Sequence, residues 1–146
     1  MMYTSYILTV VFSMVALTHG DDKGKCGDGE LEKAVKKYHD RVRKGEPSLE
    51  YDCGLQMKAK VLTDGCDLHP EHDQYVVSLH RVFPTNSIRT NKPSTLMSMG
   101  LMKWSTDKTN PDYLRTMRRT DMTKVGCAVE WCEDKRLMAV GCVYTP

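Results

Sequence analysis

The chain has 146 residues, of which 40% are hydrophobic and 27% charged, and it contains six cysteines. This length fits a single domain with its own core. The formal net charge is only +2 at neutral pH, and the basic residues are scattered among acidic ones. These features argue against a nucleic-acid-binding surface.

The first 20 residues carry no charge and have an apolar centre from Tyr6 to Leu17. Asp21 and Asp22 follow at once, a pattern typical of a secretory signal peptide. The apolar run is short for a bilayer span, and no later segment is longer. The sequence therefore predicts a signal peptide over residues 1–20, a domain over 21–146 and a secreted product with no membrane span. An uncleaved anchor is the alternative, because the start of the chain lacks Lys and Arg.

All six cysteines lie in the predicted mature domain. An even number of cysteines in an exported protein favours three disulfides, although their spacing does not decide the pairing. A zinc site is the rival interpretation, since Cys66-x2-His69 and Cys127-x4-Cys132 could supply ligands. Export favours the disulfides.

Two helices are predicted in the first half of the mature chain. Over residues 28–43, apolar side chains recur with helical spacing, Asp28 can cap the start, and Gly45 with Pro47 ends the pattern. A short extended piece at 49–52 leads into a second helix that ends near Gly65.

The second half is predicted to end in a β-hairpin. Residues 75–82 are consistent with a strand or short helix, 84–94 with a loop, 96–104 with a Met-rich core helix, and 112–119 with a basic helix. Apolar runs at 125–131 and 137–144 flank a charged turn, which is a hairpin signal. The order of elements indicates one mixed domain of helices and strands.

Three sequence blocks match motifs of one family. His39-Asp40-x-x-Arg43 is similar to an H-N-x-x-R motif, and an L-x-Y-D-x-x-L-x-x-x-A pattern follows it over residues 49–59. A V-G-C-A block starts at Val125, and C-x-Y-x-P starts at Cys142. In this order the blocks resemble the CAP superfamily of cysteine-rich secretory, antigen 5 and pathogenesis-related proteins. The nearest resemblance is to activation-associated secreted proteins of parasitic nematodes.

The resemblance implies an α+β fold, namely a three-layer α-β-α sandwich in one disulfide-stapled domain. It also implies the pairs Cys66–Cys132, Cys127–Cys142 and Cys26–Cys53. Each should contribute about 3–4 kcal/mol by the chain-entropy estimate, and we expect loss of Cys66–Cys132 to be the most costly. Because the family usually continues beyond C-x-Y-x-P, the domain is expected to be a short form or truncated at its C-terminus.

Many family members hold a divalent metal in a cleft with two His and two Glu, and here that pattern is mostly replaced. Tyr113 occupies the usual His position, and a phenol is a poor substitute for imidazole as a zinc ligand. The weak remaining candidates are His69, His72 and Asp107. Since at most one His and one carboxylate match the motif, we expect no metal and no cofactor.

Three further groups of residues have an ordinary and a functional interpretation. His39 can be a catalytic base, but a structural role is favoured. The Met-rich segment at 96–102 can line a lipid groove, but core packing is favoured. Arg115, Arg118 and Arg119 can bind an acidic partner or form a solvated basic face, and they are retained as candidate partner-binding residues.

The resemblance predicts a secreted protein that acts by extracellular binding and not as an enzyme. The implied partner is an extracellular protein of a host, with modulation of its immune or haemostatic proteins as the expected role. A sterol or lipid carrier is one alternative, and a metal-dependent hydrolase with a degenerate cleft is the other.

Overall fold

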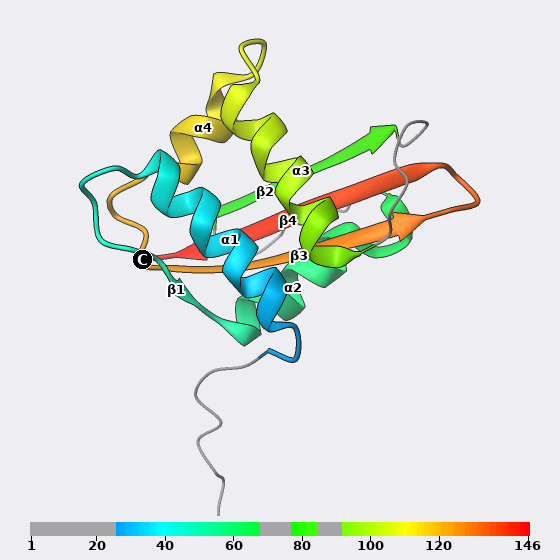
Figure 1. Cartoon of the computed structure of the whole chain (residues 1–146), viewed down its shortest axis with the longest axis horizontal. Helices are drawn as coiled ribbons and strands as arrows, with labels where there is room; N and C mark the ends of the chain where they lie inside the picture. Colours follow the sequence, from blue (N-terminus) through cyan, green and yellow to red (C-terminus); the bar gives the residue numbers. More distant parts are fainter. Residues whose placement is uncertain (1–25, 68–76, 85–91) are drawn as a thin grey trace, which may run out of the picture.

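The computed structural model describes residues 26–67, 77–84 and 92–146, which form an α+β arrangement around a four-stranded sheet (Figure 1). The helices are α1 (Gly29–Val42), α2 (Cys53–Thr63), the short 3₁₀ helix η1 (Asp64–Cys66), α3 (Pro93–Thr106) and α4 (Pro111–Met117). The strands are β1 (Glu50–Tyr51), β2 (Val77–Pro84), β3 (Lys124–Cys132) and β4 (Leu137–Thr145). The mixed class predicted from the sequence is therefore confirmed. Among the described helices, none is long and apolar enough to cross a membrane.

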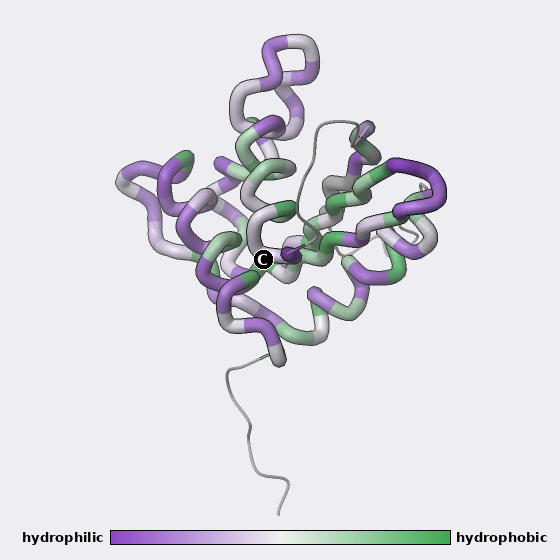
Figure 2. Tube along the Cα trace, turned by 45° about the vertical axis from the view of Figure 1, so that its right-hand side comes forward, coloured by the Kyte–Doolittle hydropathy of each residue, from purple (hydrophilic) through white to green (hydrophobic). Residues whose placement is uncertain are grey.

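The predicted terminal hairpin, β3 with β4, is confirmed and forms the centre of the sheet. The strands are in the order β1-β3-β4-β2. β3 and β4 pair antiparallel from Lys124 opposite Thr145 to Cys132 opposite Leu137. β2 pairs antiparallel with β4, and the short β1 pairs parallel with β3. The turn between β3 and β4 is hydrophilic, whereas both strands are mainly hydrophobic (Figure 2).

Helices cover both faces of this hairpin, as the alternation of its side chains requires. On one face, Val125 and Cys127 of β3 and Val140 of β4 join the main core with residues of α1 and α3. On the other, Ala128 and Val143 pack with α2. Accordingly, α1 and α3 lie in front of the sheet in Figure 1 and α2 lies behind it.

The approach of α2 to the sheet depends on a glycine in β3. A Cβ atom at Gly126 would overlap the backbone of Leu55 and Gln56, and it would lie 2.6 Å from the carbonyl oxygen of Asp52. Because backbone cannot yield as a flexible side chain does, only Gly allows this contact. The glycine therefore sets the distance between α2 and the sheet.

The helix boundaries follow from capping residues. The side chain of Asp28 accepts hydrogen bonds from the first turn of α1, and that of Asp52 does the same for α2. α3 begins at Pro93, inside the segment predicted to be a loop, because Pro suits the first helical turn. The segment predicted as a strand or short helix is a strand from Val77.

Three disulfides connect the elements: Cys26–Cys53, Cys66–Cys132 and Cys127–Cys142. These are the pairs that the resemblance implies, and no described cysteine is free. A zinc site built from Cys66, Cys127 and Cys132, the rival interpretation, is thereby contradicted.

Candidate functional site

Tyr113, which occupies the family's histidine position, is packed against another aromatic ring. α4 starts at Pro111, and the side chain of Asn110 caps it. From the first turn, the ring of Tyr113 stacks on Trp104 of α3 with the ring centroids 5.3 Å apart and the planes 1° from parallel. Trp104 is fully buried, so Tyr113 rests on the core.

A guanidinium group lies beside this aromatic pair. Arg81 of β2 has its Cζ atom 5.8 Å from the centroid of Tyr113 and 5.4 Å from that of Phe83. Its Nη1 donates to the Asp107 carboxylate at 2.5 Å. Hydrogen bonds from Thr109 and Arg81 hold the pKa of Asp107 well below its usual range, so this carboxylate stays ionised.

The described part of this site fits a zinc ion poorly. Asp107 is already bound by Thr109 and Arg81, and the charge of Arg81 opposes a second cation there. No group of three His, Cys, Asp or Glu residues among the described residues could hold a metal ion. The candidates His69 and His72 lie outside the described residues.

Both ends of the His39-x-x-x-Arg43 motif have structural roles. His39 is fully buried, and its Nδ1 donates to the carbonyl of Val35 at 2.8 Å. Its Nε2 then accepts from the hydroxyl of Tyr144 in β4 at 2.9 Å. Arg43 donates to the carbonyls of Arg119 and Met122 in the segment between α4 and β3. The structural interpretation of His39 is therefore confirmed.

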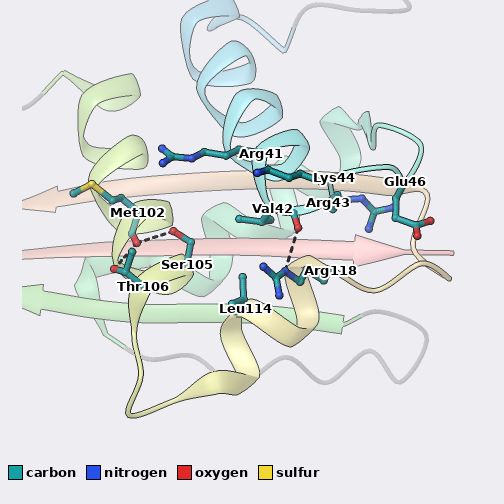
Figure 3. A pocket seen from close by; sticks show the side chains of 10 residues that line it. All are labelled: Arg41, Val42, Arg43, Lys44, Glu46, Met102, Ser105, Thr106, Leu114 and Arg118. Carbon is teal, nitrogen blue, oxygen red and sulfur yellow. Dashed lines mark hydrogen bonds between the residues drawn. The ribbon is translucent and has the colours of Figure 1, made fainter.

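A basic pocket of about 710 Å³ lies where the ends of α1 and α3 meet α4 (Figure 3). Four cationic residues, one acidic residue, three apolar residues and two hydroxyl residues line it: Arg41, Arg43, Lys44, Arg118, Glu46, Val42, Met102, Leu114, Ser105 and Thr106. We call this site the basic pocket. No motif in the sequence predicts it, because its walls come from three separate segments.

The structure separates the three candidate arginines of α4 and its C-terminal end. Arg115 pairs with Asp112 at 2.9 Å, and Arg119 pairs with Asp121 at 2.6 Å. Arg118 lines the basic pocket, where its Nε donates to the Val42 carbonyl at 3.1 Å (Figure 3). Of the three, only Arg118 shares a recess with other cations.

The Met-rich helix is mostly core. Leu96, Met97 and Leu101 are at most 1% exposed, whereas Met102 is 48% exposed and lines the basic pocket. The favoured interpretation of this segment as core is confirmed for most of its residues, whereas Met102 is exposed and Met99 is half-buried.

No protein-family model matches the sequence, and no curated protein matches it. Solved structures do. The structure of NaASP2 with Zn²⁺ superposes with a TM-score of 0.67 at 14% identity, over 86% of this chain and 83% of that one. Hookworm platelet inhibitor superposes with a TM-score of 0.58 at 19% identity, over 85% of this chain and 73% of that one. Venom allergen-like protein 4 of Schistosoma mansoni superposes with a TM-score of 0.58 at 16% identity, over 82% of this chain and 89% of that one.

These neighbours are members of the CAP superfamily, and the resemblance seen in the sequence is confirmed at the level of the fold. The chain thus has the CAP fold. Identities of this size establish the shared fold, while function has to be argued from the site.

Proposed function

We propose that this chain is a secreted CAP-domain protein, with the three-layer sandwich of that superfamily, that acts by binding an extracellular protein. The observation that carries the proposal is a contrast between two places: contacts within the protein already engage the side chain at the Tyr113 position, whereas the basic pocket is open to a partner. Tyr113 and Asp107 are engaged by Trp104 and Arg81, whereas the basic pocket offers unpaired charge beside apolar surface.

Two observations support export. The first 20 residues have the composition of a signal peptide. The three disulfides suit an oxidising compartment. The mature domain would then span residues 21–146.

The partner surface is proposed to include α4 and its end, where Arg115, Arg118 and Arg119 lie. One structural neighbour is a platelet inhibitor from hookworm, which makes host haemostatic and immune proteins the first partners to test. Neither alternative has comparable support. Leu96, Met97 and Leu101 are buried core residues and are not free to line the apolar groove expected of a sterol carrier. Among the described residues, no group of three His, Cys, Asp or Glu could hold a metal ion for a hydrolase.

The test is surface plasmon resonance with the oxidised mature protein against purified ectodomains of platelet and leukocyte receptors and soluble plasma proteins. We expect saturable binding to at least one, tighter than about 10 µM, together with a functional effect in platelet aggregometry or leukocyte adhesion. No binding across the panel, combined with chelator-sensitive hydrolysis or saturable sterol uptake, would replace this proposal with one of the alternatives.

A further inference from the structure

We infer that the basic pocket binds an acidic peptide segment in which carboxylates flank an apolar side chain. The inference rests on the proposed binding function and names the chemistry of the partner. It also assigns the binding of the carboxylates to Arg41, Lys44 and Arg118. Of these, Arg41 and Lys44 were not candidates in the sequence analysis.

The basic pocket has an excess of positive charge, because four cationic residues and one acidic residue line it. Arg41, Lys44 and Arg118 are exposed, and none of them has a carboxylate partner among the described residues. Arg43 adds a buried cation that contacts only carbonyls, and Glu46 is the one acidic residue of the lining. A carboxylate brought here gains attraction without breaking an existing ion pair.

Several cations elsewhere on the described surface are already paired with carboxylates. Lys33 pairs with Glu30, Arg115 with Asp112, and Lys135 with Asp67. An incoming anion would have to compete with these built-in carboxylates. Other described cations, among them Lys36, Lys37 and Arg136, also have no carboxylate partner in the described part of the chain. What distinguishes the pocket is that three such cations line one recess beside apolar side chains.

Helix ends alone do not account for this concentration of charge. Cations stabilise a helix C-terminus through its dipole, and α1 ends here at Val42. That terminus carries about half a negative charge, and the Nε of Arg118 already donates to the Val42 carbonyl. Most of the positive charge of Arg41 and Lys44 is therefore available to attract an anionic ligand.

The walls of the pocket favour a peptide over a sulfated polysaccharide. Val42, Leu114 and the half-exposed Met102 form an apolar side, and Met adapts readily to different partners. In Figure 3, Arg41 from the last turn of α1 and Lys44 from the segment just after it extend toward the α3 side, where Met102 lies. A volume of about 710 Å³ suits a side chain with its neighbours, within the usual range for ligand pockets.

The experiment is a titration of the isotopically labelled, oxidised protein with the capped peptide Glu-Glu-Leu-Glu-Glu, followed by amide chemical shifts. We expect saturable shifts confined to the lining of the pocket, with a Kd below about 1 mM that rises with salt. Glu-Glu-Ser-Glu-Glu should bind several-fold more weakly, and Lys-Lys-Leu-Lys-Lys should not bind.

The matched variants carry the same change in net charge. Arg41→Glu with Lys44→Glu should weaken binding about tenfold or more, whereas Lys60→Glu with Lys135→Glu, at two exposed positions outside the pocket lining, should change it less than about twofold. Equal losses in both variants, shifts spread over the surface, or tighter binding of a heparin disaccharide would overturn the inference. If a protein partner from the receptor panel still binds the Arg41→Glu, Lys44→Glu variant with full affinity, the pocket assignment fails while the binding function stands.

Discussion

His39 is a buried histidine whose protonation the fold opposes. Burial lowers its pKa from 6.5 to about 4, since both ring nitrogens are used and no carboxylate contacts them. As the pH falls from 6.5 to 4, His39 binds a proton in the unfolded chain but stays neutral in the folded chain. The free energy of unfolding should therefore decrease across this window, by about 3 kcal/mol in total.

Urea unfolding at several pH values between 7 and 4 measures this effect. His39→Gln is the control, because an amide can still contact Val35 and Tyr144 but does not titrate. We expect the variant to be less stable at pH 7 and to lose less stability on acidification. Identical pH slopes for the two proteins would show that another group is responsible.

The cluster of Arg81, Asp107 and Tyr113 leads to a prediction about zinc. We expect calorimetric titration of the oxidised protein to show no zinc binding at micromolar concentrations. Tyr113→His should not create binding, because the guanidinium of Arg81 stays beside the ring and Asp107 stays engaged. Micromolar binding that His69→Ala abolishes would contradict this prediction and restore the metal-dependent alternative.

At the residue scale, some of the candidate site was readable from the sequence and some was not. The ion pair of Arg115 with Asp112 could be inferred from the sequence, because residues three apart on a helix are neighbours. The ion pair of Arg81 with Asp107 could not, because it joins β2 to the end of α3. Contacts between distant segments leave no local signal.

The contact of α2 with β3 gives a prediction at the scale of elements. Gly126→Ala should destabilise the protein by more than about 3 kcal/mol, beyond ordinary overpacking, because its Cβ would overlap the backbone of α2. Gly29→Ala is the matched control, since a Cβ there meets nothing within 4 Å. Thermal unfolding of both variants is the measurement, and equal stability of the two would mean that α2 can move away from the sheet without loss.

Elements with a clear period were predictable, and weakly patterned ones were not. The stripe of α1 and the two apolar runs of the hairpin each bury a face, so sequence and structure agree there. α3 was placed too late, because the polar first turn, with Ser94 and Thr95, resembles a loop. The parallel pairing of β1 with β3 depends on a distant register that no local pattern carries.

At the scale of the whole molecule, three connections hold the helices to the hairpin and to the segment that leads into it. α1 is joined through His39 to Tyr144, and Arg43 fixes the segment after α4. On the other face, Cys66–Cys132 ties η1, which follows α2, to the end of β3. The basic pocket is a product of this assembly, since α1, α3 and α4 meet only when they pack together on the sheet.

The disulfides should therefore make different contributions to the free energy of unfolding. Cys66 and Cys132 are 66 residues apart, and Cys26 and Cys53 are 27 apart, which gives about 4 and 3.5 kcal/mol by the chain-entropy estimate. Cys66 is also buried, so replacing both members of its pair by Ala adds a small cavity. Double Ala variants of each pair, compared by thermal unfolding, should rank the Cys66–Cys132 variant as the less stable. A lower melting temperature for the Cys26–Cys53 variant would instead locate the critical restraint at the start of α1.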